Sequence, residues 1–371
     1  MNLKEKTIKY AKSIGIDLIG FVKSEVFEDL RERINSRKEK DYLSGFEEKD
    51  IEKRIDPQLT MKDAKTIIVV GVPYYIHENN INHDTNPEFY GKISRSSWGK
   101  DYHVVLKEKM KKLMELMQEE LGKIKYRFFV DTGPLVDRHL AYKAGIGWYG
   151  KNNCIITENY GSWVFIGYIL CDLEIETENH EENRCAKCNK CIDACPTGAL
   201  MDNYEYNAKR CISFLTQTKE DISYQLREKM GNSLYGCDVC QLVCPHNVNV
   251  EGGYDEFFPE EHNYRPNLLE LLQLSNKQFK KKYGDIALGW RGNKVLKRNT
   301  IIALGNSGDI KVLDHIKKYL EDSSPMIRKY AAWAAIRLDK VRGKKLLEEH
   351  LKKEKDPQVI SEIKKLYKYY L

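Results

Sequence analysis

The chain has 371 residues, of which 42% are hydrophobic and 31% are charged, and its formal net charge is +6. This length allows two or three domains with cores of their own. The composition is that of an ordinary globular protein, and it excludes a membrane-spanning one because no apolar run is long enough to cross a bilayer.

The chain opens with the segment MNLKEKTIKYAKSIGID, which predicts an amphipathic helix with Leu3, Ile8, Ala11 and Ile14 as its apolar residues. The segment lacks the apolar core and the small-residue cleavage site of a signal peptide. We therefore expect a cytoplasmic protein, in which thiols stay reduced and structural disulfides are rare. Ten cysteines in that compartment indicate metal binding rather than disulfide bridges.

Residues 1–175 predict one α/β unit, which we expect to be the catalytic domain. Apolar, β-branched runs predict buried strands, and apolar residues at helical spacing predict helices. In chain order the predicted elements are a strand at 64–75, a helix at 101–121, a strand at 126–136 that runs into a Gly-Pro turn, a helix that begins near 136 and ends in glycines before 152, and a strand at 162–175.

Residues 176–250 are dense in cysteine and predict a ferredoxin-like domain. The run Cys185-x2-Cys188-x2-Cys191-x3-Cys195-Pro196 matches the bacterial ferredoxin motif. In that motif three thiolates bind one 4Fe–4S cluster, and the fourth cysteine, which precedes a proline, binds a second cluster. The sequence should therefore contain a second set of cluster ligands.

A second run, Cys237-x2-Cys240-x3-Cys244-Pro245, is the same motif without its first cysteine. Leu234 occupies the position of the missing ligand, and Cys211 is the obvious substitute. Eight cysteines are then present, which is enough for two 4Fe–4S clusters.

We expect a crossed arrangement of these eight ligands. One cluster takes Cys185, Cys188, Cys191 and Cys244, and the other takes Cys195, Cys211, Cys237 and Cys240. The alternative is two zinc sites of four thiolates each, but zinc sites usually use two separated CxxC pairs. The remaining cysteines, Cys154 and Cys171, lie in apolar stretches and predict small buried side chains.

Residues 251–290 form a mixed connector, and residues 291–371 predict a HEAT-like helical repeat with turns at Pro325 and Pro357. The repeat carries 20 Lys and Arg against 10 Asp and Glu, so it is far more basic than the rest of the chain. Such a charge excess suits a polyanionic partner, and the alternative is a solvated, lysine-rich surface. Four residues beside Trp290 have helical spacing suited to a phosphate backbone: Arg291, Lys294, Lys297 and Arg298.

Asp131 ends the apolar run YRFFVD and is a candidate general acid, because burial at a strand end raises the pKa of a carboxyl group. The alternative is a turn residue that bonds the backbone of the DTGP segment. Asp137 is predicted to be a charge at a helix N-terminus. His103 is either an acid, a ligand or an ordinary half-buried histidine.

The order of motifs resembles the epoxyqueuosine reductase family. The resemblance covers residues 54–338 and includes VDTGPLVDR, AGIGWYGKN, GSWVFIGYIL, the cysteine runs, RCISFLTQ and LKRNTIIALGNSGD. It implies an N-terminal α/β cobalamin-binding domain, a double 4Fe–4S domain and a HEAT-like module that binds tRNA. It also implies a reaction in which the epoxide of epoxyqueuosine in the tRNA anticodon loop is reduced to give queuosine.

The resemblance also implies roles for single residues. Asp131 matches the proton donor of the family. Further residues fall in stretches that resemble those lining the corrinoid pocket, namely Arg54, His103, Trp148, Lys151 and Ser213. Cobalamin rests on the resemblance alone, because no corrinoid-binding motif is visible in the sequence.

Three other function classes are weighed against this one: a reductive dehalogenase-like enzyme acting on a small molecule, a pure electron-transfer protein, and an RNA-binding protein with zinc at its cysteines. The basic tail and the missing export signal argue against the first. No nucleotide-binding motif is present, so we expect an external reductase or ferredoxin to supply electrons. We also expect a monomer.

Overall fold

The computed structural model describes residues 1–81, 87–177 and 184–371. Two compact units make up the chain, and each contains segments that are far apart in the sequence. Unit 1 comprises Met1–Asn80, Lys100–Cys211 and Asp238–Phe258, and unit 2 comprises Ile81–Gly99, Ile212–Cys237 and Pro259–Leu371. These units do not follow the predicted linear boundaries, because the segments 1–175, 176–250 and 251–290 are each divided between them. Residues 82–86 and 178–183 lie outside the described part.

Unit 1 is built on a four-stranded sheet in the order β1-β2-β7-β4, in which every pairing is antiparallel. The strands are β1 (Leu18–Lys23), β2 (Thr66–Pro73), β4 (Tyr126–Val130) and β7 (Val164–Cys171). The three strands predicted from apolar runs are confirmed. Because the sheet is antiparallel, the mixed α/β expectation resolves to an α+β arrangement in this unit.

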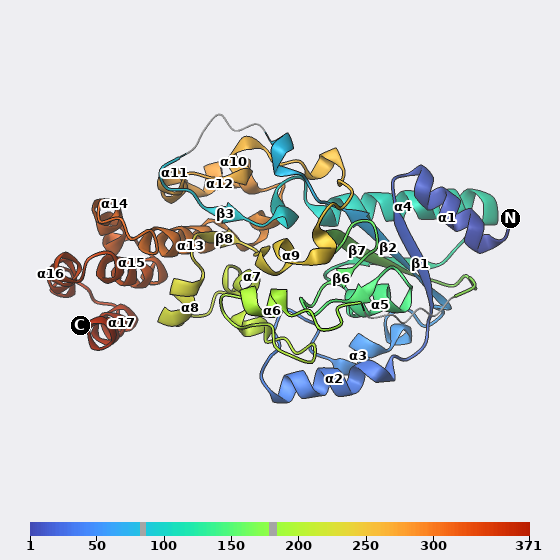
Figure 1. Cartoon of the computed structure of the whole chain (residues 1–371), viewed down its shortest axis with the longest axis horizontal. Coiled ribbons are helices and arrows are strands. Elements are labelled where there is room, and N and C mark those ends of the chain that lie inside the picture. Colours follow the sequence, from blue (N-terminus) through green and yellow to red (C-terminus); the bar gives the residue numbers. More distant parts are fainter. Residues whose placement is uncertain (82–86, 178–183) are drawn as a thin grey trace. The chain divides into compact units, whose positions relative to one another are not determined.

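Helices cover both faces of the sheet (Figure 1). On β2, Ile68, Val70 and Val72 pack with α1 (Leu3–Ser13) and α4 (Tyr102–Leu121). The alternate residues Ile67 and Val69 pack with α2 (Glu28–Glu39) and α5 (Asp137–Lys143). Side chains of a strand point to opposite faces in turn, so a strand covered on both faces must be apolar throughout. This is why β2 shows no polar alternation.

Unit 1 also contains short elements. They are α3 (Ile51–Ile55), β5 (Trp148–Tyr149), β6 (Ile155–Ile156), α6 (Lys190–Ala194) and α9 (Val239–Leu242). β5 and β6 form a small antiparallel pair, and α6 packs against α9. The two cysteine runs therefore meet within one unit, although many residues separate them in the sequence.

Unit 2 is mostly helical (Figure 1). Its single strand pair, within the described residues, joins β3 (Lys92–Ile93) and β8 (Ser233–Tyr235) in parallel. Its helices are α7 (Ile212–Leu215), α8 (Tyr224–Lys229), α10 (Glu261–Tyr264), α11 (Leu268–Gln273), α12 (Asn276–Tyr283), α13 (Asn293–Gly305), α14 (Val312–Lys317), α15 (Pro325–Leu338), α16 (Lys340–Leu351) and α17 (Pro357–Tyr370).

The helical repeat predicted for the C-terminal part is confirmed, with α15 at its centre. Pro325 and Pro357 are the first residues of α15 and α17, a position that suits proline because its missing N–H has no helical partner. α15 packs against α13, α16 and α17. The small residues of the segment AAWAA and its Trp333 are fully buried. Gly343 allows α16 to approach closely, since a Cβ there would lie 2.4 Å from the carbonyl oxygen of Ala335.

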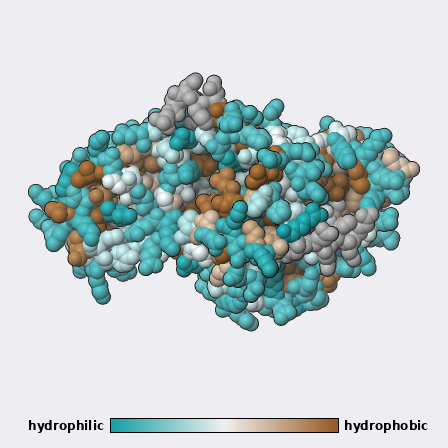
Figure 2. All heavy atoms as spheres, viewed as in Figure 1, coloured by the Kyte–Doolittle hydropathy of each residue, from teal (hydrophilic) through white to brown (hydrophobic). Residues whose placement is uncertain are grey.

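The face of the molecule in Figure 2 is largely hydrophilic, with apolar residues in scattered groups. Over the residues that the structure describes, no helix combines the length and the apolar character needed to span a membrane.

Arg298 does not belong to an exposed basic edge, and that expectation is wrong for this residue. Its side chain is 0% exposed in α13. The guanidinium donates hydrogen bonds to the carbonyl oxygens of Leu215 and Thr218 and to the side chain of Asn299. Arg298 therefore holds the segment before α8 against the helical repeat, and it offers no charge to a ligand at the surface.

We expect Arg298→Ala to lower the free energy of unfolding by about 2–4 kcal/mol, because two buried carbonyl groups lose a charged donor. Lys294→Ala, on the exposed side of the same helix, is the control and should change it by less than about 0.5 kcal/mol. Urea denaturation of the full chain measures both. Equal stability of the two variants would contradict the structural role of Arg298.

Candidate active site and cluster-binding region

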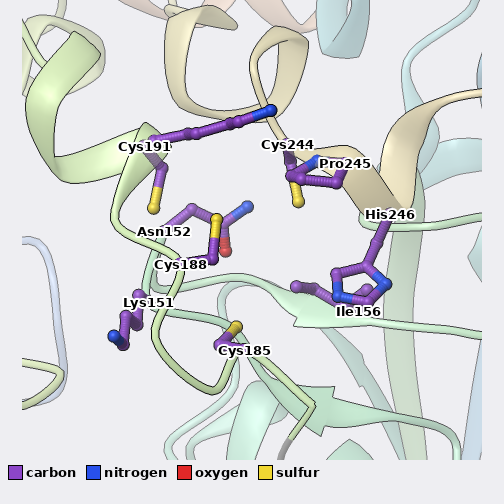
Figure 3. A pocket seen from close by; sticks show the side chains of 10 residues that line it. Lys151, Asn152, Ile156, Cys185, Cys188, Cys191, Cys244, Pro245 and His246 are labelled. Carbon is purple, nitrogen blue, oxygen red and sulfur yellow. The ribbon is translucent and has the colours of Figure 1, made fainter.

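A cavity in unit 1 is bordered by four of the eight predicted cluster cysteines. They are Cys185, Cys188, Cys191 and Cys244, the set expected for one cluster of the crossed arrangement. Figure 3 shows their four sulfur atoms facing the same space, with Ile156 and His246 on one side. The cavity encloses about 310 Å³ of space, part of it open to solvent. Cys195 is not among the lining residues, although it is nearer to Cys191 in the sequence than Cys244 is.

Local backbone features place the first three cysteines of the first run. The amide of Cys188 donates to the carbonyl oxygen of Cys185 at 2.9 Å, which closes a tight turn. Ala186 within that turn has a φ of +42°, a conformation that side chains other than glycine seldom adopt. Cys191 then lies in the first turn of α6. The three thiols therefore come from one short, constrained loop.

Cys244 is held in place by an amide network. The residue precedes a short 3-10 turn that begins at Pro245. Asn247 in that turn accepts the amide of Ser162 at 2.7 Å and donates to the carbonyl oxygen of Gln241 at 2.7 Å. Gly161 leaves the room for this contact, since a Cβ there would lie 2.0 Å from the Asn247 side-chain oxygen. These bonds fix the segment just before β7 to the second cysteine run.

The remaining cluster cysteines lie outside the cavity. Cys195 accepts a hydrogen bond from the amide of Ala199 at 3.3 Å. Cys211 follows a 3-10 turn whose last residue, Arg210, donates to the carbonyl oxygen of Thr197 at 2.6 and 2.9 Å. Cys195, Cys211 and Cys240 belong to unit 1, whereas Cys237 is the last residue of a segment of unit 2.

The four cavity cysteines fit a 4Fe–4S cluster. Among the described residues, no three Cys, His, Asp or Glu side chains converge on the position of a single metal ion. The thiols instead surround a space, and a cubane places one iron behind each thiolate. Burial and the neighbouring thiols raise the pKa of Cys191 to about 11, so the thiol is protonated when no metal is bound. Binding of a metal displaces this proton.

A chain of carboxylates and a histidine occupies the edge of the sheet in unit 1. Asp131 follows β4 with a φ of +56°. Asp101 caps α4 and lies 2.7 Å from His103 Nδ1, while Asp131 Oδ2 lies 3.7 Å from His103 Nε2. The sequence hypotheses for His103 and Asp131 therefore concern one structural site.

These contacts set the charges of the site. Partial burial lowers the pKa of His103, but hydrogen bonds and charges from Asp101 and Asp131 outweigh it and raise the pKa to about 9. The hydrogen bond with His103 lowers the pKa of Asp131. The expectation of a raised pKa at Asp131 is therefore wrong, because the effect of its cationic partner on the pKa outweighs the effect of burial. At neutral pH the proton resides on His103.

Asp137 is the first residue of α5, which confirms the helix N-terminal position that the sequence predicted. Burial and the charge of Asp131 raise its pKa to about 7. Its carboxylate accepts the amide of Asp131 at 3.0 Å, which closes the DTGPLV loop. The only sequence signal was a second aspartate six residues after the first, and that spacing carries no information about burial.

The buried N–H donors of unit 1 for which the described residues supply no acceptor include Arg37 Nε, Trp148 Nε1 and Asn152 Nδ2. Arg54 is 8% exposed, and burial lowers its pKa, as does the charge of nearby Arg138. Burial and Arg138 likewise lower the pKa of Arg37, to about 10. Buried donors without acceptors fit a ligand rich in amide and phosphate oxygens, and cobalamin is such a ligand.

The other predicted cofactor contacts lie in different places. Trp148 is buried with Cys185 and Cys244, and Arg184 lies 4.9 Å above its ring. Lys151 donates to the carbonyl oxygen of Ala186 at 3.0 Å and to Asn189 Oδ1 at 2.8 Å, so it supports the loop of the first cysteine run. Ser213 belongs to α7 in unit 2, where its carbonyl oxygen accepts the side chains of Thr216 and Gln217.

Three of the four basic residues predicted to bind nucleic acid have access to solvent. Arg291 lies 3.8 Å from the ring centre of Trp290, which is 57% exposed. Lys294 is exposed and Lys297 is half-buried on α13. An exposed aromatic ring beside cationic side chains suits an unstacked base and its phosphates.

Comparison with known proteins gives matches along the whole chain. Residues 54–132 match the domain described as epoxyqueuosine reductase QueG, residues 184–247 match a 4Fe–4S double cluster binding domain, and residues 286–366 match HEAT repeats. The second match spans all eight predicted ligands and favours iron–sulfur clusters over zinc. The curated epoxyqueuosine reductase of Bacillus subtilis (strain 168) is 42% identical over 365 residues, which are 98% of this chain and 95% of that protein.

Two solved structures are similar over almost the full length. A crystal structure of epoxyqueuosine reductase with an epoxyqueuosine-modified tRNA-Tyr stem loop has a TM-score of 0.92 at 42% identity, covering 99% of this chain and 98% of that one. A structure of the Bacillus subtilis enzyme, described with its aspartate catalytic loop swung out of the active site, has a TM-score of 0.93 at 41% identity, with the same coverage.

The ligand assignment predicts the iron content of variants. We expect Cys244→Ala and Cys211→Ala each to lose about half of the iron, because each removes a ligand from a different cluster. Cys154→Ala is the matched control and should keep full iron. Iron and sulfide analysis after anaerobic purification measures this. Unchanged iron in Cys211→Ala would show that the crossed assignment is wrong.

The charge arrangement predicts the titration of His103. Its pKa of about 9 lies above the ordinary value of 6.5. The ion pairs of His103 therefore contribute fully to stability below pH 6.5, and this contribution is lost as the pH rises through about 9. We expect Asp131→Asn to lower the His103 pKa, measured by NMR of the imidazole. Asp63→Asn, which removes an exposed partner of Lys125, is the control. A His103 that titrates near 6.5 in the wild type would contradict the arrangement.

Proposed function

This chain belongs to the epoxyqueuosine reductase family, and from that premise we propose how its own residues serve the reaction. The protein is an oxidoreductase that reduces the epoxide of epoxyqueuosine in the tRNA anticodon loop to give queuosine. It uses two 4Fe–4S clusters and cobalamin. The observation that carries the mechanism is the Asp101–His103–Asp131 arrangement, in which Asp131 interacts with the charge of Arg138, as do the buried Arg37 and Arg54.

Reduction of the epoxide removes one oxygen as water and leaves an alkene, which consumes two electrons and two protons. When bound, cobalamin and the two clusters supply the electrons of this reduction. The chain itself must position the substrate and deliver protons. The residues of this chain therefore transfer protons, bind the cofactors and orient the substrate.

We assign the delivery of a proton to His103 and Asp131. The His103 pKa of about 9 keeps the imidazole protonated at neutral pH. Asp101 accepts from Nδ1 at 2.7 Å and so directs Nε2 toward the Asp131 carboxylate at 3.7 Å. A proton passes from Nε2 to Asp131 and from there to the oxygen that leaves the substrate carbon. Asp131 is the catalytic residue of this proposal, and His103 holds its proton.

The cofactor contacts follow from burial and unpaired donors. Arg54 is a buried cation and Trp148 Nε1 is a buried donor without an acceptor among the described residues, and both suit the phosphate and amide oxygens of cobalamin. Asp131 and Arg54 both interact with the charge of Arg138. Lys151 supports the cluster loop through Ala186 and Asn189. For Ser213, the only support for a cobalamin contact is the resemblance of its sequence motif to that of the family.

The proposed tRNA contacts are Trp290, Arg291, Lys294 and Lys297, without Arg298. Their support is the exposed indole beside a guanidinium and the charge excess of the helical repeat. We further propose that an external reductase or ferredoxin provides electrons and that the protein acts as a monomer in the cytoplasm, where its tRNA substrate is found.

The reaction is tested by anaerobic reconstitution with iron, sulfide and cobalamin, followed by reduction and incubation with epoxyqueuosine-containing tRNA. Mass analysis of the modified base should show the loss of one oxygen, and the loss should depend on cobalamin. If full clusters and bound corrinoid give no conversion, the substrate belongs to another class, and a small molecule reduced by a dehalogenase-like enzyme becomes the better proposal.

Asp131→Ala should retain both clusters and cobalamin and lower turnover by about 10²–10⁴-fold, the range for loss of a general acid. Asp63→Asn is the control for a surface carboxylate and should turn over like the wild type. Single-turnover assays with saturating tRNA separate the proton step from binding. Turnover of Asp131→Ala near the wild-type rate would assign the proton to another group, with Asp137 the next candidate.

Reversal of charge in Lys294→Glu/Lys297→Glu should weaken tRNA binding and reduce the slope of its salt dependence, because phosphate contacts release counterions. The control is Lys111→Glu/Lys112→Glu, which carries the same charge change on α4 of unit 1. Binding titrations at several salt concentrations measure both variants. If the two double variants bind alike, the proposed contact surface lies elsewhere.

A further inference from the structure

The loop between Cys195 and Cys211 is more than a connection between two cluster ligands. Residues Leu200 and Tyr206 form an isolated antiparallel bridge, and the amide of Asn207 donates to the carbonyl oxygen of Ala199 at 2.9 Å. Arg210 ties the end of the loop to the carbonyl oxygen of Thr197. The start and the end of this loop are therefore held together.

The folded loop brings polar donors to both of its cysteine sulfurs. Cys195 Sγ receives the amide of Ala199 at 3.3 Å and lies 3.7 Å from the Thr197 hydroxyl. Tyr206 forms a side-chain hydrogen bond with Cys211. Thr197 is 1% exposed, so water does not compete for its hydroxyl group.

The surroundings strengthen the phenol of Tyr206 as a donor. The guanidinium of Arg37 lies 5.5 Å from the centre of the Tyr206 ring. A phenol can donate its O–H to a thiolate, which only accepts, and the nearby cation favours that donation.

We propose that the hydroxyl groups of Tyr206 and Thr197 raise the reduction potential of the second cluster by donating hydrogen bonds to Cys211 and Cys195. This rests on the proposed ligation of that cluster by these two cysteines. Reduction adds negative charge that is shared with the thiolate sulfurs, and a donor to sulfur stabilises the more negative form. Tyr206 and Thr197 are positioning residues that make this cluster easier to reduce.

Tyr206→Phe and Thr197→Val each remove one hydroxyl group and keep the shape of the side chain. Thr197→Val also keeps the backbone carbonyl that Arg210 binds. We expect each variant to shift the reduction equilibrium of the second cluster about tenfold toward the oxidised form, which is about 59 mV for one electron. The potential of the other cluster should stay unchanged.

EPR-monitored redox titration of the full-length holoprotein measures both potentials without any turnover. The signal that disappears in Cys211→Ala identifies the second cluster. Tyr126→Phe is the matched control and should leave both potentials unchanged, because Tyr126 lies on β4 and pairs with Cys171, which is not a predicted cluster ligand.

Unchanged potentials in variants with full iron would overturn the proposal, and so would a shift in the other cluster alone. If Tyr206→Phe fails to assemble its clusters, Thr197→Val decides the question by itself. The two proposals fail separately. If the variants shift the potential but the protein does not convert tRNA, the proposed reaction is wrong and the proposed role of the two hydroxyl groups stands. If the protein converts tRNA normally and the potentials do not shift, the reaction stands and the role of the hydroxyl groups is wrong.

Discussion

Much of unit 1 depends on the requirement that four thiolates surround one small cavity. The loop from Cys185 to Cys191 supplies three of them within a tight turn and the start of a short helix. The next cysteine in the chain, Cys195, does not line this space, and Cys244 supplies the fourth thiolate. The Ser162–Asn247–Gln241 bonds hold Cys244 there, because they fix the second cysteine run to the segment just before β7. The cluster region and the sheet are thereby parts of one folded unit.

The same unit separates its charges in a way that suits reduction chemistry. Carboxylates gather around His103 at the sheet edge and keep a proton there at neutral pH. The guanidinium groups of Arg37 and Arg54 are buried and interact with the charge of Arg138, and Arg37 Nε has no acceptor among the described residues. A proton source and buried donors thus belong to one unit.

Basic residues in the helical repeat have two different roles, and the sequence alone does not distinguish these roles. Lys294 faces solvent, whereas Arg298, one helical turn further on, is fully buried and bonded to backbone carbonyl oxygens. A guanidinium is suited to both roles, because its planar donors bind carbonyl and phosphate oxygens equally well. The charge excess of the repeat therefore overstates the number of cations available to RNA.

The sequence by itself determined the strands, the long helices, the cluster type and the family, because periodicity and cysteine spacing are local properties of the chain. It also indicated that Cys244 and not Cys195 completes the first cluster, since ferredoxin motifs share ligands in a fixed pattern. The tertiary structure decided the ionisation of Asp131, Asp137 and His103, the burial of Arg298 and the division into two units. These properties depend on groups that are distant in the chain, and burial and electrostatic interactions act through space and leave no pattern in the sequence.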